Sequence, residues 1–283
     1  MKCILPAVLL AWCLDPGAAL AYGGRADAAS VRSGAAGRPT ADPILREVRA
    51  RFPREPVLLS GELTVRRRRG VVVRRLGFEA AVDWGGEPPS IRYTIRDAFG
   101  ADLEQLTVFH EAPGLFRVAY GAGDPPRDRI PPSLFEAVQG SDVNWLDLTL
   151  SFLWWPGAEI AGTETLRGRA CRVVDVPAPA PAEGEEDDDR YAGVRLWIDK
   201  ELSMLLQMEA YHSGGETVKR MWVKSLKKMG DRWMIKDMEI RSFPEAHRTR
   251  LRVRKVEEGA RGEGPAFAKA TAGKRGMRER NVR

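Results

Sequence analysis

Residues Val194–Phe243 read VRLWIDKELSMLLQMEAYHSGGETVKRMWVKSLKKMGDRWMIKDMEIRSF. Apolar and polar residues alternate along much of this stretch, which is the period of a β-strand that buries one face. The alternation is interrupted at Asp199-Lys200-Glu201, at Ser213-Gly214-Gly215 and at Gly230-Asp231, which have the composition of tight turns. Turns this short join antiparallel neighbours, because parallel strands need long crossovers. The stretch therefore predicts four consecutive antiparallel strands.

The period of two also recurs on both sides of this stretch. Leu63 and Val65 alternate with polar residues, and so do Ile91, Tyr93 and Ile95. About a dozen such segments follow one another, and most of their connections are short and polar. We therefore predict a mainly β fold with a few helices, an antiparallel up-and-down β-barrel or half-barrel of about eleven strands.

Three segments have helical spacing instead. Apolar residues recur every three to four positions in residues 44–52, where Asp42 is a candidate N-cap and Pro43 fits the first turn. Residues 131–138 begin with helix start signals, and residues 142–154 continue with an apolar stripe. We expect the last two segments to form helices that cover an open face of the sheet.

The chain divides into four parts by composition. Residues 1–21 have a positive start, a short apolar stretch and the small-residue cleavage site Ala19-Leu20-Ala21, as in an export signal. Residues 22–40 predict a flexible leader, residues 41–258 the folded domain, and residues 259–283 a basic disordered tail. The signal predicts a periplasmic protein.

The positive charge is concentrated in the predicted tail. The whole chain has a formal net charge of +6, and residues 259–283 contribute seven basic and two acidic residues to it. The rest of the chain is therefore close to neutral. This distribution argues against a protein that binds nucleic acid through its folded domain.

Residues with catalytic or metal-binding potential are few and scattered. His110, His212 and His247 are far apart in the sequence and lack the spacing of metal ligands. Cys171 is the only cysteine after the predicted signal and lies in a strand pattern, which favours a buried structural thiol. The acidic run Glu183–Asp189 is contiguous, which favours a solvated loop over a calcium site. We therefore predict no enzymatic activity, no metal and no cofactor.

Tryptophan and methionine gather in the second half of the chain. Such side chains cover large apolar areas and adapt to irregular partners, which suits a cavity for flexible apolar ligands. An ordinary barrel core would explain them equally well. The candidate cavity residues are Trp145, Phe152, Trp154, Trp197, Met208, Trp222, Trp233 and Met238.

Two basic features belong to the predicted strands. Arg66–Arg69 precede a glycine and predict a tight basic hairpin, and arginines occupy every second position from Arg248 to Arg254. Either surface could meet anionic lipid headgroups or an acidic partner. The alternative is a solvent-facing surface whose arginines pair with acids on adjacent strands.

Three stretches resemble a known protein family. They are Val194–Phe243, Gly140–Leu148 (GSDVNWLDL) and Leu166–Ala180, and the similarity extends from Ala41 to Val256. They resemble the outer-membrane lipoprotein-sorting proteins of the LolA/LolB-like superfamily of periplasmic lipoprotein carriers. The resemblance implies a half-open antiparallel barrel whose mouth is covered by helices and whose apolar cavity carries acyl chains without covalent chemistry.

The leading hypothesis is a periplasmic carrier or chaperone that binds acyl chains of lipoproteins or lipids for transfer towards the outer membrane. The resemblance implies an inner-membrane transporter and an outer-membrane acceptor as partners. The alternative is a periplasmic sensor or adaptor module of a membrane transporter that binds protein rather than lipid. An enzyme is a third, disfavoured hypothesis that a cluster of histidine and carboxylates in one cleft would revive.

Overall fold

The computed structural model describes residues 38–181, 190–229, 232–244 and 247–259. The predicted export signal, the predicted leader up to residue 37, the acidic run Glu183–Asp189 and the predicted tail from residue 260 lie outside the described residues. In the described ranges, no helix has the length and apolar character needed to cross a membrane.

Strands dominate the described residues, with two α-helices and three short 3₁₀ helices between them. In chain order the elements are α1 (Asp42–Ala50), β1 (Val57–Arg66), η2 (Arg68–Gly70), β2 (Val72–Asp83), β3 (Ser90–Arg96), β4 (Asp102–Ala112), β5 (Leu115–Ala122), β6 (Arg127–Arg129), η3 (Val138–Gly140), α2 (Trp145–Thr149), η4 (Ser151–Trp154), β7 (Glu159–Leu166), β8 (Arg169–Pro177), β9 (Gly193–Asp199), β10 (Leu205–Tyr211), β11 (Thr217–Met229), β12 (Arg232–Ser242) and β13 (Arg248–Glu258).

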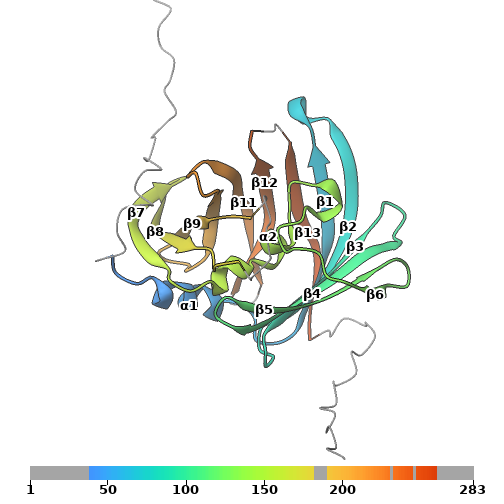
Figure 1. Ribbon diagram of the computed structural model, residues 1–283, viewed down its shortest axis with the longest axis horizontal. Helices are drawn as coiled ribbons and strands as arrows, with labels where there is room; N and C mark the ends of the chain where they lie inside the picture. The colour runs from blue at the N-terminus through green and yellow to red at the C-terminus, as the bar shows by residue number, and fades with distance from the viewer. Residues whose placement is uncertain (1–37, 182–189, 230–231, 245–246, 260–283) are drawn as a thin grey trace, which may run out of the picture. The chain divides into compact units, whose positions relative to one another are not determined.

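All the described strands form one antiparallel sheet in the order β6-β5-β4-β3-β2-β1-β13-β12-β11-β10-β9-β8-β7 (Figure 1). The sheet is not closed, because β6 and β7 are its two edges. This confirms the predicted mainly β, half-open antiparallel architecture. The sheet has thirteen strands rather than about eleven. It also consists of two meanders that join where the first strand, β1, pairs with the last, β13.

The sheet curves and encloses the core on its concave face. In β2 the residues Leu76, Phe78, Ala80 and Val82 are buried and alternate with partly exposed ones, as expected for a strand with one buried face. Gly61 sits at a bulge in β1, where a Cβ atom would lie 2.1 Å from the Arg252 carbonyl oxygen and 2.8 Å from the Phe78 ring. Glycine is therefore required where β1 approaches β13 this closely.

Residues 130–158, which we call the crossing segment, connect the two edges of the sheet. Because β6 and β7 are opposite edges, the chain between them has to cross the sheet. Figure 1 shows this segment, with α2, running across the concave face. Its apolar side chains from Phe135 to Leu153 belong to the same buried cluster as the strands. The prediction that segments 131–138 and 142–154 cover the open face is therefore confirmed.

The helices within the crossing segment are shorter than the sequence predicts. Residues 131–138 contain turns and a bridge at Ala137 instead of a helix. Residues 142–154 do not form one helix, because Leu150 adopts a left-handed conformation with φ 52° between α2 and η4. Side chains on all sides of α2 are buried, so the segment packs as two short pieces rather than as one amphipathic helix.

The first predicted helix forms as α1, with one difference at its start. Its N-cap is Ala41 instead of Asp42, and the side chain of Asp42 lies in the first turn. The buried residues Ile44, Leu45 and Val48 face the core, in agreement with the predicted apolar stripe. The backbone N–H of Ala41 donates to the Ala158 carbonyl oxygen at 2.7 Å, which ties the start of α1 to the end of the crossing segment.

Candidate functional site: an apolar cavity under the crossing segment

Buried polar pairs attach the crossing segment to the sheet. The Lys219 Nζ atom of β11 lies 2.9 Å from Asp147 Oδ2 in α2, and the Tyr191 hydroxyl donates to Asp147 Oδ1 at 3.2 Å. The Thr249 hydroxyl of β13 donates to Asp142 Oδ2 at 2.8 Å and accepts from the Asp142 N–H at 3.0 Å. Asp147 is fully buried. These contacts fix the position of α2 over β11 and β13.

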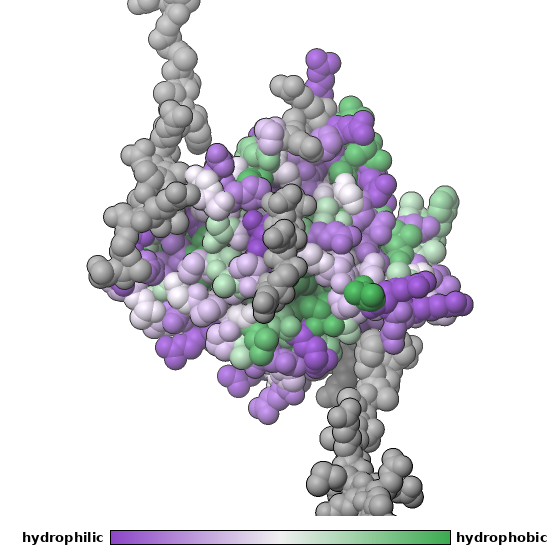
Figure 2. All heavy atoms as spheres, viewed as in Figure 1, coloured by the Kyte–Doolittle hydropathy of each residue, from purple (hydrophilic) through white to green (hydrophobic). Residues whose placement is uncertain are grey.

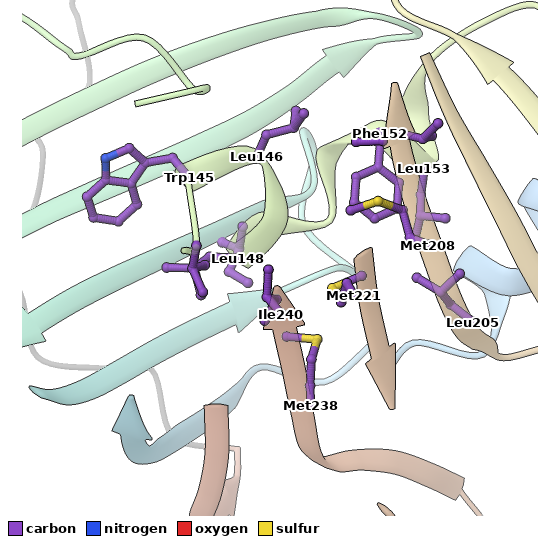
Figure 3. Close-up of a cluster of buried hydrophobic side chains, with 14 of the residues drawn as sticks. Trp145, Leu146, Leu148, Phe152, Leu153, Leu205, Met208, Met221, Met238 and Ile240 are labelled. Atoms are coloured by element: carbon purple, nitrogen blue, oxygen red, sulfur yellow. The ribbon is translucent and has the colours of Figure 1, made fainter. Parts of the chain in front are cut away.

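Apolar side chains fill the space between α2 and the strands. Figure 3 shows Leu148 of α2 beside Ile240 of β12, and Phe152 of η4 beside Met208 of β10. Met221 and Met238 are buried on the same face. The unbranched methionine side chains fill irregular gaps where a short helix crosses strands at an angle. This part of the concave face is a packed core.

An apolar cavity lies next to this core, between α1, the crossing segment and the sheet. Its volume is about 140 Å³, and the chain contributes to its wall from α1, β1–β3, α2–η4, the start of β10 with the turn before it, β12 and β13. Polar side chains in the wall are few, among them Arg51, Thr149 and Ser203. Its apolar wall includes Phe52, Trp84, Tyr93, Leu153, Met238 and Leu251.

The cavity is large enough for part of a lipid tail. A protein cavity of roughly 150 Å³ holds a ligand the size of benzene, so about 140 Å³ accepts one short alkyl segment. A second, more polar pocket of about 530 Å³ lies nearby, between the β7–β8 and β9–β10 turns. Trp233 lines both pockets and is 41% exposed. Its indole therefore borders both pockets and is partly in contact with solvent.

An aromatic cluster borders the cavity. Trp84 stacks on Phe52 and lies 5.0 Å from Trp154, measured between ring centroids. His110 stacks on Trp154 at 4.0 Å, and its Nε2 atom lies 3.2 Å from the Ser151 hydroxyl. Burial lowers the pKa of His110 to about 4, so the imidazole is neutral at neutral pH.

The Nε2 atom of His110 contacts the Ser151 hydroxyl, and its Nδ1 atom lies 3.4 Å from the carbonyl oxygen of Pro89. Neither partner is a carboxylate. Ser151 is itself fully buried. These contacts give His110 a packing role in the aromatic cluster beside the cavity. Within the described residues, no group of three or more His, Cys, Asp or Glu side chains is placed to hold a metal ion.

Two of the predicted cavity residues, Met238 and Trp233, line the cavity. A third, Trp154, lies beside it, where it stacks on the lining residue Phe52 and packs at a tilt against Trp84. Three others are buried in the adjacent core instead, namely Trp145, Phe152 and Met208.

Trp197 and Trp222 do not line the cavity, because they lie on the convex face. Trp197 packs against Cys171 in a separate cluster, and its Nε1–H donates to Glu164 Oε2 at 2.8 Å. Trp222 follows the inward-facing Met221 in β11, and Lys224 Nζ lies 5.7 Å from its ring. The sequence does not separate these two residues from inward-facing ones, because β9 and β11 carry large apolar side chains on both faces.

Phe52, Trp84 and Leu251 were missed by the sequence analysis, although each has a signal there. Phe52 belongs to the apolar stripe of the first helix, Trp84 follows the apolar alternation of Leu76, Phe78, Ala80 and Val82, and Leu251 lies between arginines. Leu251 is far from the other two in the sequence. The pairing of β1 with β13 brings it to the same wall, and local periodicity carries no information about that pairing.

The arginines of β13 lie on the convex face and pair with acids. Arg250 and Arg252 both contact Asp237 Oδ1 of β12, at 3.1 and 2.8 Å. Burial acts to raise the pKa of Asp237, but hydrogen bonds from the two arginines outweigh it and hold the pKa below its ordinary value. Arg254 contacts Glu62 of β1 at 2.8 Å. This stripe fits the alternative of a solvent-facing surface that is neutralised by adjacent strands.

Several solved structures are similar to this fold. A DUF1329 family protein from Desulfovibrio piger matches with a TM-score of 0.67 at 14% identity, over 82% of this chain and 97% of that one. A putative outer membrane lipoprotein-sorting protein domain from Vibrio parahaemolyticus matches with a TM-score of 0.65 at 15% identity, over 78% and 93%. A LolA superfamily protein from Nitrosomonas europaea matches with a TM-score of 0.56 at 13% identity, over 78% and 94%.

At the level of sequence, no curated protein matches this chain. A family model with the description "Uncharacterized protein" matches residues 128–269, which is half of the chain. The resemblance to lipoprotein-sorting proteins is confirmed by the fold that the solved structures share. The chain belongs to the family of uncharacterized proteins that this model describes, and its fold is LolA-like.

Proposed function

We propose that this protein is a periplasmic carrier that binds an acyl chain of a lipid or lipoprotein in the cavity under the crossing segment. The observation that carries the proposal is the cavity itself, an apolar space bounded by aromatic and methionine side chains. Transfer of each CH₂ group from water into such a space contributes about 0.8 kcal/mol. The LolA-like fold supports the same function.

The resting cavity holds only part of a long chain, so binding requires a route for the rest. Trp233 stands between the cavity and the second pocket. Rotation of its indole would let a tail continue from one pocket into the other. The crossing segment is the other element that can shift, since Leu148, Leu150 and Leu153 contact the cavity without polar bonds through their side chains.

The route of the cargo follows from the predicted export signal. A cleaved signal places the folded domain in the periplasm, where a shielded acyl chain can pass from an inner-membrane donor towards an outer-membrane acceptor. Both membrane partners are part of the proposal. The adaptor hypothesis differs in that the cavity would remain empty while a protein surface is bound.

The proposal is tested with the protein from residue 22 onwards, purified from the periplasm. We expect native mass spectrometry to detect co-purified lipid, and a fluorescent fatty acid to bind and to be displaced by hexadecanoate. Leu251→Trp fills the cavity and should weaken probe binding at least tenfold. Leu115→Trp introduces the same side chain at a 57% exposed position of β5 and should leave binding unchanged.

Two results would contradict the proposal. One is a protein that binds no acyl probe after delipidation, and the other is equal binding by wild type and Leu251→Trp. Crosslinking that traps one dominant membrane protein together with an empty cavity would favour the adaptor. Unfolding curves of both variants show whether each is folded under the assay conditions.

A further inference from the structure

The hairpin between β1 and β2 carries arginines that the structure leaves without acidic partners. Arg69 and Gly70 have φ values of 67° and 80° and make the tight turn that the sequence predicts. Arg67, Arg69 and Arg75 are exposed, and none of them forms an ion pair with a described residue. This distinguishes them from the neutralised arginines of β13.

A row of arginines continues from the hairpin across the convex face. Residues directly opposite each other in neighbouring strands lie close together, so like charges there are destabilising. From β1 through β13, β12 and β11, the directly opposed residues of the row are Arg66, Arg248, Arg241 and Arg220. Two of these four have acidic partners, since Arg220 contacts Glu209 at 2.7 Å and Arg248 contacts Glu239 at 3.5 Å.

The other two members of the row have no acidic partner among the described residues. The Arg66 Nε atom is buried without a hydrogen bond, and the Arg241 guanidinium lies 5.1 Å from the Phe243 ring. A sheet that keeps like charges this close leaves positive potential at one end of its convex face. An anionic partner at this end would relieve the repulsion.

Apolar side chains lie at the tip of the same hairpin. Val71 is 61% exposed and Val73 is 45% exposed. Figure 1 shows the hairpin reaching beyond the neighbouring strands, and Figure 2 shows hydrophilic and hydrophobic side chains next to each other over that end. The tip therefore combines positive charge with exposed apolar surface on a protruding element.

We propose that the hairpin tip, residues 67–75, and the adjoining arginine row dock on an anionic lipid membrane. The arginines would lie among the headgroups, and Val71 and Val73 would enter the interface. A soluble polyanion would require the arginines but would gain nothing from the valines. The cavity is lined by Val57 and Val82, which lie at the ends of β1 and β2 opposite the hairpin, so docking does not depend on cavity occupancy.

The first test is sedimentation with vesicles of equimolar phosphatidylglycerol and phosphatidylcholine, and with vesicles of phosphatidylcholine alone. We expect binding to the anionic vesicles only, weakened by salt. A basic residue near an anionic surface contributes roughly fivefold to affinity. Arg67→Gln/Arg69→Gln/Arg75→Gln should therefore weaken binding at least tenfold, even though the basic residues 259–283 remain present.

The matched control is Arg46→Gln/Arg127→Gln/Arg129→Gln, which removes three exposed arginines from α1 and β6. The net charge changes by the same amount in both variants, so the control should bind within about twofold of wild type. Equal loss in both variants would show attraction by net charge alone and would overturn the proposal. Equal binding by wild type and the hairpin variant would overturn it too.

The valines separate a membrane from a soluble polyanion. Val71→Asn/Val73→Asn should weaken binding to anionic vesicles several-fold and leave retention on heparin unchanged. Retention on heparin without any vesicle binding would assign the surface to a polyanion and overturn the proposal. The substituted side chains are exposed, so unfolding midpoints close to that of wild type are expected and are measured for every variant.

Discussion

The crossing segment is held differently on its two sides. On one side Asp147 and Asp142 form buried polar contacts with Lys219 and Thr249. On the other side Leu153 faces a cavity of about 140 Å³ among apolar side chains. Buried polar pairs tolerate little displacement, because each separated group loses its partner away from water. Apolar contacts are non-directional and can re-form around a ligand. The polar side thus fixes the segment, and the apolar side borders an apolar space.

The largest effect is expected from breaking the ion pair on the polar side. Lys219→Met leaves the fully buried Asp147 carboxylate without its cation. Loss of one partner of a buried pair typically costs about 3–5 kcal/mol of the free energy of unfolding. Chemical denaturation measures this cost.

The double variant Asp147→Asn/Lys219→Met separates charge from shape. The amide has the size of the carboxylate and no charge, so the double variant should be more stable than Lys219→Met alone. A loss below about 1 kcal/mol for Lys219→Met would contradict the assignment of this pair as the main attachment of α2.

The next largest effect concerns His110, which borders the apolar side. Its pKa is lowered to about 4 in the folded protein by burial, whereas an unfolded chain takes up the proton near pH 6.5. The contribution of neutral His110 to the free energy of unfolding is therefore intact above pH 6.5 and is lost as the pH falls towards 4. The loss amounts to about 3 kcal/mol, because one pKa unit corresponds to about 1.4 kcal/mol.

His110→Gln keeps a side chain that can contact the Ser151 hydroxyl and does not titrate. Between pH 7 and pH 4, the unfolding free energy of wild type should fall by about 3 kcal/mol more than that of this variant. Parallel stability curves over that range would show that His110 is not buried as a neutral group.

A smaller effect is expected at the second polar contact. Thr249→Val keeps the shape of the side chain and removes the hydroxyl that donates to Asp142 and accepts from its N–H. A hydrogen bond to a charged, buried group contributes about 2 kcal/mol. Thermal unfolding should show a loss of this size. Thr249→Ser retains the hydroxyl and should therefore be nearly as stable as wild type.

The sequence predicted the strands well because their signal is local. The turns at Asp199-Lys200-Glu201 and Ser213-Gly214-Gly215 separate alternating segments, and the structure has strands on both sides of each. The pairing of β1 with β13 joins residues almost two hundred positions apart, and no local pattern contains it. The wall formed by Phe52, Trp84 and Leu251 depends on that pairing and was therefore missed.

The faces of the late strands were the second source of error. β11 has register shifts between Val223 and Ser225 and between Ser225 and Leu226, which change the parity of inward positions along the strand. Trp222 and Trp233 look equivalent in the sequence, yet one lies on the convex face and the other lines the cavity. The single helix predicted over residues 142–154 does not form. Side chains on all sides of α2 are buried, so an apolar stripe does not identify the face that packs on the sheet.

The smallest effect on stability is expected at Trp233, where the effect on binding should be the most informative. Trp233→Ala removes a side chain that is 41% exposed, and we expect a loss of about 1 kcal/mol or less. Because Trp233 lines both pockets, the same change should connect the cavity with the second pocket. Long fatty acids should then gain affinity relative to short ones, because more CH₂ groups find apolar surroundings.

The control is Trp222→Ala, which removes the same side chain from the convex face. Displacement of a fluorescent probe by hexanoate and by hexadecanoate gives the ratio of affinities for each variant. Only Trp233→Ala should change this ratio in favour of the longer chain. An unchanged ratio would mean that the tail does not pass Trp233, and the route would then lie under the crossing segment, beside the lining residues Leu148 and Leu150.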